Sequence, residues 1–202
     1  MNRPVVIIGY GQESQIVKEI INLNGDRIIG YLDDYKTDKE VLGKITDIDK
    51  LIGFDFYFIN TITDNEVRKK ICEENKNLKW YKAIHPDAII SKEAAIGCGC
   101  IIHAGTIVNN EAEIGPFTIL NTGCIVEHNC KIHEYNHLCP RVTICGNVKI
   151  KELNTIGAGA VAINNIIINR KNVIGAGAVI TKDILETNGV YAGIPVRKVR
   201  EL

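Results

Sequence analysis

His128 is one of the five histidines of this chain, whose side chains are suited to acid–base chemistry. Imidazole titrates near neutral pH, so it can take a proton from an attacking nucleophile. Asn129 follows directly, and its neutral amide can orient one ring nitrogen. An exposed polar residue without a catalytic role is the alternative. The spacing of the five histidines is not that of a site with three or four ligands, so we expect no metal.

A glycine-rich turn near the start of the chain points to phosphate binding. Gly9-Tyr10-Gly11 follows an apolar segment, as in a dinucleotide fingerprint, but Ser14 occupies the place of its third glycine. A nicotinamide cofactor is therefore disfavoured. The turn could still direct backbone N–H groups at a phosphate, with Asp33 and Asp34 placed to bind ribose or base hydroxyls. Alternatively, the glycines form only a strand-to-helix turn and the aspartates lie in a solvated loop.

The first 83 residues have the pattern of an α/β domain that would position this turn. Apolar segments predict strands over 4–9, 27–32 and 54–60, and helical spacing covers 12–23. Asp64 is the expected N-cap of a second helix, in which Glu66 and Lys70 have the spacing of an ion pair. Strands that alternate with helices predict a parallel sheet, so we assign 1–83 to a Rossmann-like domain.

A six-residue period replaces this pattern from Ile84 to Ile180. An aliphatic residue recurs at every sixth position, with only Ala162 smaller, and a mostly small side chain follows four residues later. Neither a helix nor an ordinary strand has this period, whereas a triangular solenoid with three hexads per coil does. The spacing predicts a parallel β-helix over 84–182 and a C-terminal cap over 183–202. His128 takes the third position of its hexad, at a corner where side chains point outward.

Composition limits the classes of binding partner and the cellular compartment that we expect for this protein. Acidic and basic residues balance at 24 each, which argues against nucleic acid and against anionic membranes. No apolar run is long enough for membrane insertion, and the start enters a strand without a signal peptide. The seven cysteines form no C-x-x-C pair, and Cys100, Cys124 and Cys130 occupy the small inward slot of the repeat. We therefore expect a reduced, cytoplasmic protein.

The hexads and several motifs carry a specific resemblance. The hexads at 156–161 and 174–179 (IGAGAV in both) match the repeat of the left-handed β-helix acyltransferases. The chain resembles, over nearly all its length, the nucleotide-sugar N-acetyltransferases of the bacillosamine and perosamine type, which are related to sialic acid O-acetyltransferases. The motifs that carry this resemblance lie at 32–34 (LDD), 64–68 (DNEVR), 84–86 (IHP), 120–122 (LNT), 125–128 (IVEH) and 189–195 (GVYAGIP).

This resemblance implies a reaction and an assembly. The expected activity is acetyl transfer from acetyl-CoA to the 4-amino group of a nucleotide-linked 4-amino-4,6-dideoxyhexose. The amine would attack directly, with His128 as general base and without an acyl-enzyme. The expected assembly is a homotrimer with an active site shared between subunits. O-acetylation of a sugar and a non-catalytic sugar-nucleotide-binding scaffold are the alternatives.

The resemblance also suggests where acetyl-CoA binds. His137 corresponds to a position near the thioester, where a donor could orient the carbonyl; packing of an outward strand residue is the alternative. Small residues that would let pantetheine approach the backbone, or simply suit a tight corner, are Gly146, Ala158 and Ala176. Basic residues that could meet the CoA phosphates, or form a solvated surface, are Arg170, Lys171, Arg197, Lys198 and Arg200.

The nucleotide-sugar site is expected in the N-terminal domain. By resemblance, the uridine-diphosphate part would bind at Gly11, Asp33, Asp34 and Thr63. The altered glycine turn leaves another nucleotide carrier open, and the sequence does not specify the hexose.

Asn129 is the main departure from the family pattern. The family usually places a carboxylate directly after the catalytic histidine, and Glu127 points the opposite way in an extended backbone. We therefore predict a less basic His128 and slower turnover. The other three histidines, His85, His103 and His133, are assigned structural or solvated roles.

Overall fold

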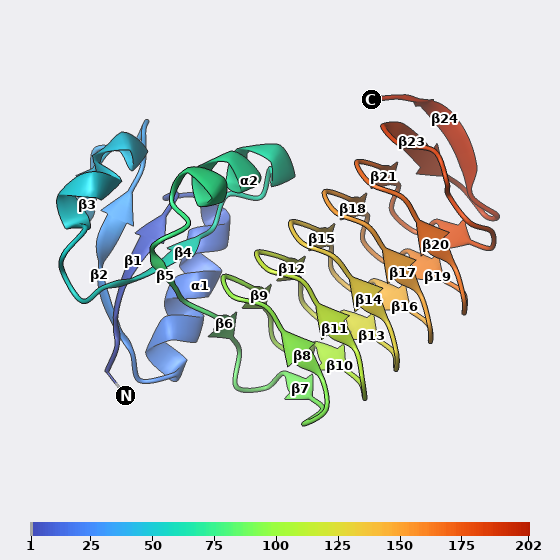
Figure 1. The fold of residues 1–202 in the computed structure, drawn as a ribbon, viewed down its shortest axis with the longest axis horizontal. Coiled ribbons are helices and arrows are strands. Elements are labelled where there is room, and N and C mark those ends of the chain that lie inside the picture. The colour runs from blue at the N-terminus through green and yellow to red at the C-terminus, as the bar shows by residue number, and fades with distance from the viewer. Residues whose placement is uncertain (1) are drawn as a thin grey trace.

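The computed structural model describes residues 2–202, and it consists of an α/β unit beside a long solenoid (Figure 1). The elements of the α/β unit are β1 (Pro4–Ile8), α1 (Gln12–Leu23), β2 (Arg27–Leu32), β3 (Val41–Gly43), the 3-10 helix η1 (Ile45–Leu51), β4 (Tyr57–Asn60), α2 (Asn65–Glu74) and β5 (Lys79–Trp80). The five strands form a fully parallel sheet in the order β3-β2-β1-β4-β5.

The sequence locates most of these elements correctly. The first helix and the second strand have the predicted bounds, and Asp64 caps α2 by accepting a hydrogen bond from the Val67 N–H at 2.9 Å. The strand expected over 54–60 begins only at Tyr57. The predicted Glu66–Lys70 ion pair is wrong, because the Glu66 carboxylate pairs with Lys171 of the solenoid at 2.6 Å.

The solenoid is a left-handed β-helix built from seventeen two-residue strands, β6 to β22. The first face contains β6 (Ala83–Ile84), β9 (Ile101–Ile102), β12 (Ile119–Leu120), β15 (His137–Leu138), β18 (Thr155–Ile156) and β21 (Val173–Ile174). The second face contains β7 (Ile89–Ile90), β10 (Ile107–Val108), β13 (Ile125–Val126), β16 (Thr143–Ile144), β19 (Val161–Ala162) and β22 (Val179–Ile180). The third face contains β8 (Ala95–Ile96), β11 (Glu113–Ile114), β14 (Lys131–Ile132), β17 (Lys149–Ile150) and β20 (Ile167–Ile168).

The six-residue period has the predicted structural meaning. In each strand the second residue points into the core and the first points outward, and paired strands of successive coils are 18 residues apart, as in Ile107↔Ile125. Corner one links the first face to the second, corner two links the second to the third, and corner three links the third back to the first. After β22 the chain adds β23 (Gly189–Ala192) and β24 (Arg197–Glu201) to the first-face sheet, and Tyr191 joins the solenoid core.

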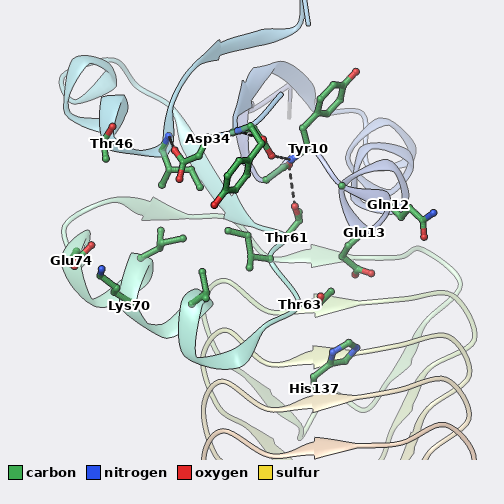
Figure 2. Close-up of a pocket in the computed structure, with 18 of the residues that line it drawn as sticks. Tyr10, Gln12, Glu13, Asp34, Thr46, Thr61, Thr63, Lys70, Glu74 and His137 are labelled. Atoms are coloured by element: carbon green, nitrogen blue, oxygen red, sulfur yellow. Dashed lines mark hydrogen bonds between the residues drawn. The ribbon is translucent and has the colours of Figure 1, made fainter. Parts of the chain in front are cut away.

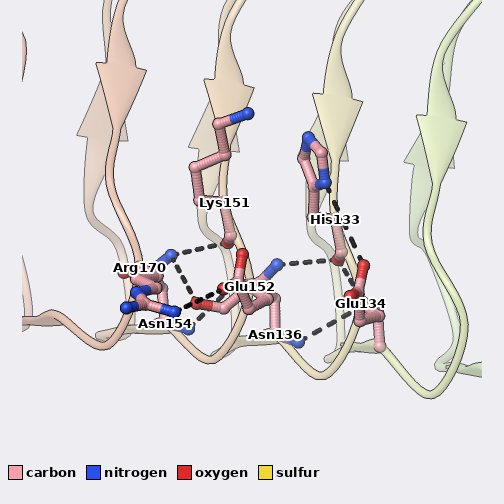
Figure 3. Close-up of polar contacts among 8 residues, drawn as sticks. His133, Glu134, Asn136, Lys151, Glu152, Asn154 and Arg170 are labelled. Atoms are coloured by element: carbon pink, nitrogen blue, oxygen red, sulfur yellow. Dashed lines mark hydrogen bonds and ion pairs between the residues drawn. The ribbon is translucent and has the colours of Figure 1, made fainter.

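A ladder of buried asparagines runs inside corner three (Figure 3). Asn136, Asn154 and Asn172 are fully buried and stand one coil apart. The side-chain oxygen of Asn136 accepts from the Asn154 N–H at 2.8 Å, and that of Asn154 accepts from the Asn172 N–H at 2.9 Å. Each side-chain amide donates to a carbonyl of its own corner, such as Lys151 at 2.7 Å. The ladder therefore satisfies buried polar groups along the axis of the solenoid.

The α/β unit packs on the first face of the solenoid. Helix α1 lies between its own sheet and this face, where Val17, Ile20 and Ile21 join one apolar cluster with Ile101 and Ile119. On the other side of the sheet, η1 and α2 cover a second cluster. This packing fixes the α/β unit against the coils that carry the candidate site.

Arg68 connects the two parts from α2. Its side chain is 1% exposed, and it donates to Asn65 Oδ1 (2.6 Å) and to the carbonyls of Ile62 (2.9 Å), Thr63 (3.1 Å), Phe117 (2.9 Å) and Asn136 (3.3 Å). Burial lowers the pKa of this guanidinium to about 10. A buried cation held by neutral acceptors in both parts is a structural connection between them.

The three faces differ in their outward residues. The α/β unit covers the first face, whereas the third face is mostly polar and includes a Glu113–Lys131 ion pair of 2.8 Å. The outward residues of the second face are nearly all aliphatic: Ile89, Ile107, Ile125, Thr143, Val161 and Val179. Ile89 is 65% exposed, and the other five are half-buried. The second face is thus an apolar surface that no segment of residues 2–202 covers.

Candidate active site

A pocket of about 910 Å³ opens where the carboxyl ends of the α/β strands meet the first face (Figure 2). It is lined by Gly9–Glu13, Asp33–Tyr35, Ile45, Thr46, Thr61–Thr63, Val67, Lys70, Ile71, Glu74, Asn121 and His137. The four residues expected to bind the nucleotide sugar, Gly11, Asp33, Asp34 and Thr63, all line it. Glu13, Lys70 and Asn121 line it as well, although the sequence analysis assigned none of them to a site.

The N-terminus of α1 points unsatisfied donors at this pocket. Gly11 is its N-cap, and no side chain caps the first turn. The first N–H groups of a helix attract an anion, both as donors and through the helix dipole. Ser14 is fully buried and its hydroxyl donates to the Gly11 carbonyl at 2.6 Å, so it reinforces the turn in place of the fingerprint's third glycine.

The side chains of Asp33 and Asp34 lie at the rim of the pocket and accept hydrogen bonds from backbone N–H groups. Asp33 accepts from the N–H groups of Tyr10 (2.8 Å), Tyr35 (2.9 Å) and Lys36 (2.9 Å). Burial alone would raise the pKa of Asp33, but these hydrogen bonds outweigh burial and hold it below its usual range. Asp34 accepts from the Ile45 N–H at 3.0 Å through Oδ1 only, so its second carboxylate oxygen retains acceptor capacity.

Imidazole and carboxylate groups lie at the floor of the pocket. His137 Nε2 is buried and finds no hydrogen-bond partner among residues 2–202. Burial, together with the charge of Arg68, lowers the pKa of His137 to about 4, so this ring is neutral at neutral pH. Beside it, His103 is 1% exposed and its Nε2 lies 2.7 Å from Glu13 Oε1. The His137 ring, which is neutral and has a free Nε2, therefore suits hydrogen bonding to a ligand better than carrying charge.

His128 lies outside this pocket, exposed at corner two. Its Nδ1 lies 2.9 Å from Asn129 Oδ1. Gly146 stands one coil further along the same corner, and a Cβ there would come within 2.7 Å of the His128 ring. Any larger residue at position 146 would therefore overlap the His128 ring as it lies in this structure.

The other two residues expected at the acetyl-CoA groove lie on a different edge. Ala158 and Ala176 are exposed at corner one, so the second face separates them from His128 within one chain. The pocket also approaches corner one, because Asn121 leads from β12 into that corner. The predicted site residues therefore form two groups, one at corner two and one at corner one with the pocket.

Comparisons with known proteins connect these features to a family. Residues 4–75 match the family model of the PglD N-terminal domain. A UDP-N-acetylbacillosamine N-acetyltransferase of Bacillus subtilis (strain 168) is 36% identical over 111 residues. That alignment spans 48% of this chain and 50% of the relative, so it covers only about half the length of this curated protein.

Two solved structures match over nearly the whole chain. A mutant perosamine N-acetyltransferase from Caulobacter crescentus, in complex with CoA and GDP-perosamine, has a TM-score of 0.94 and 27% identity, covering 98% of this chain and 97% of that one. The acetyltransferase domain of PglB from Neisseria gonorrhoeae FA1090, in complex with acetyl coenzyme A, has a TM-score of 0.93 and 29% identity, covering 98% and 100%. The chain is similar over nearly all its length to hexapeptide-repeat nucleotide-sugar N-acetyltransferases. The resemblance inferred from its motifs is thereby confirmed.

Two features are not found among residues 2–202. Within residues 2–202, no cluster of three or more His, Cys, Asp or Glu side chains could hold a metal ion. Over the same residues, no helix has the length and apolarity needed to cross a membrane.

Proposed function

We propose that this protein transfers an acetyl group from acetyl-CoA to the 4-amino group of a nucleotide-linked 4-amino-4,6-dideoxyhexose. The observation that carries the proposal is the combination of an anion-binding pocket with an exposed imidazole beside a glycine. It occurs in a chain that matches structures holding CoA and GDP-perosamine over nearly their whole length. The nucleotide would occupy the pocket of this Rossmann-like unit. Its diphosphate would bind the α1 N-terminus and Lys70, and its hydroxyls would bind Asp34 and Thr63.

His128 is the general base of the proposed reaction. The neutral sugar amine attacks the thioester carbon and a C–N bond forms. Nε2 of His128 takes the proton released from nitrogen. When the C–S bond breaks, the same proton passes to the departing CoA sulfur, so the ring returns to its starting form. His137, neutral in its buried position, donates to or accepts from the substrates without titrating at neutral pH.

A homotrimer would bring the two groups of site residues together. The apolar second face needs a cover, and three copies packed through it around an axis would bury it. That packing places corner two of one subunit beside corner one of the next. His128 would then meet the Ala158 and Ala176 edge and the pocket of its neighbour. The small side chains at this edge would let pantetheine lie close to the backbone.

The test is acetyl-CoA-dependent thiol release over a panel of UDP-, dTDP- and GDP-linked 4-amino sugars and their 4-hydroxy counterparts. We expect turnover with an amino sugar, its loss in His128→Ala, and a trimeric mass for both proteins. His133→Ala is the matched control, because it removes a half-exposed imidazole at corner three. Turnover only with hydroxy sugars would indicate O-acetylation, and no turnover with any sugar would indicate a binding scaffold. Activity retained in His128→Ala would refute its role.

A further inference from the structure

The carboxylate missing beside His128 in sequence is supplied from the preceding coil. Asn129 and Glu111 stand 18 residues apart at corner two, both with positive φ (58° and 56°), so their side chains project from equivalent corner positions. The Asn129 side-chain amide donates to Glu111 Oε2, and its oxygen lies 2.9 Å from His128 Nδ1. Three side chains therefore form a continuous line from carboxylate through amide to imidazole.

The Glu111 carboxylate determines which atoms of Asn129 and His128 carry the protons in this chain of hydrogen bonds. A carboxylate only accepts hydrogen bonds, so the Asn129 NH2 group must face Glu111. The Asn129 oxygen must then face the ring, and because that oxygen only accepts, Nδ1 of His128 must carry the proton. The neutral ring is left with its lone pair on Nε2, the nitrogen that also faces Gly146. Without Glu111 the amide could turn round and the opposite tautomer would be equally satisfied.

We propose that Glu111 is a positioning residue for the general base, acting on His128 through Asn129. This inference rests on the proposed role of His128 in the reaction. Glu111 selects the Nδ1–H tautomer, and its negative charge favours the imidazolium formed when Nε2 takes the amine proton. Glu127 precedes His128 in the sequence, but among residues 2–202 the side-chain partner of the His128 ring is Asn129 and not Glu127. Gly146 and Asn164, from the following coils, also face the ring, and both are uncharged.

The tautomer is measured directly by nitrogen-15 NMR of the His128 ring. We expect the Nδ1–H form in the wild-type protein and a mixture of both forms in Glu111→Gln, because a glutamine amide can donate as well as accept. Glu113→Gln is the matched control, since Glu113 is an exposed carboxylate close in sequence that bonds to Lys131 and not to Asn129. A wild-type Nε2–H form, or equal tautomer ratios in all three proteins, would overturn the inference whether or not the protein is an acetyltransferase.

Kinetics give a second, separate test. We expect Glu111→Gln to lower kcat by about 10-fold with little change in KM, and Glu113→Gln to leave both unchanged. In the double variant Asn129→Asp/Glu111→Gln a carboxylate contacts the ring directly, so kcat should recover and the acid limb of its pH profile should shift relative to Glu111→Gln alone. Equal kcat for the Glu111 and Glu113 variants, or no recovery in the double variant, would contradict the positioning role. Turnover that survives His128→Ala would instead refute the proposed function and leave the tautomer result standing.

Discussion

Replacing the central asparagine of the corner-three ladder should destabilise the solenoid strongly. In Asn154→Ala, the Asn172 N–H loses its acceptor at 2.9 Å and the Lys151 carbonyl loses its donor at 2.7 Å. Asn154 is fully buried, so water does not replace these partners. Each orphaned polar group costs ~1 to 3 kcal/mol. We therefore expect the free energy of unfolding to fall by about 3 kcal/mol.

Two further variants separate hydrogen bonding from packing. Asn154→Leu restores volume but no polar partner, so it should be no more stable than Asn154→Ala. Asn110→Ala is the matched control, because Asn110 is exposed in a turn at corner two and its backbone carbonyl, which accepts from Asn129, is retained.

The assay is urea unfolding at equilibrium, followed by circular dichroism at one fixed protein concentration, since assembly also contributes to stability. Losses of less than about 0.5 kcal/mol in Asn154→Ala, comparable to Asn110→Ala, would refute the reasoning. Recovery of stability in Asn154→Leu would assign the effect to the cavity and not to the ladder.

Three other perturbations test the connection between the two parts, the base and the pH response. Arg68→Met removes five hydrogen bonds, and of their acceptors the Asn136 carbonyl keeps the Ile119 N–H as a donor, so the variant should cost at least about 3 kcal/mol, with faster hydrogen exchange in α2. Gly146→Ala places a Cβ 2.7 Å from the His128 ring, so kcat should fall by about 100-fold while the melting temperature changes little. Burial alone would raise the pKa of Asp26, but hydrogen bonds from Arg3 and Tyr81 lower it to about 2. This carboxylate should therefore contribute about 2 kcal/mol above pH ~4, and the stability gap between wild type and Asp26→Asn should close as the pH falls toward 2.

The fold was largely predictable because the solenoid is a one-dimensional repeat. Each hexad repeats the same local requirement, an aliphatic residue inward and a small residue four positions later, so no long-range pairing has to be inferred. The prediction was weakest where two parts of the chain meet. The Glu66–Lys171 ion pair and the Arg68 contacts join helix α2 to distant coils, and helical spacing alone suggested Lys70 as the partner of Glu66.

The sequence indicated several residues that line the pocket, but not the contacts between distant parts of the chain around it. The motifs placed the nucleotide contacts at Gly11, Asp33, Asp34 and Thr63, and all four line the pocket. Spacing along the chain could not show that Glu13 would meet His103, because that contact joins the first helix to the solenoid.

The relation between Asn129 and Glu111 was unpredicted for a different reason. The family pattern directs attention to a carboxylate next to His128, whereas neighbours on a β-helix corner are also found 18 residues away. The same 18-residue step relates His128 to Gly146. A β-helix sequence aligned in steps of one coil pairs Glu111 with Asn129 and Asn147, and His128 with Gly146, so the spacing itself contains this information.

The same step also explains how one repeat serves three different surfaces. The inward positions are nearly alike on all faces, but the outward position of every third hexad belongs to the same face. Ile101 and Ile119 on the first face contact the cluster that includes helix α1, and Glu113 and Lys131 on the third face pair in solvent. The outward residues of the second face are aliphatic except for Thr143. Folding of a single chain does not require one uncovered face of the solenoid to be apolar and another to be charged. This asymmetry supports the proposal that corner two, with His128, lies at the edge of an interface between subunits.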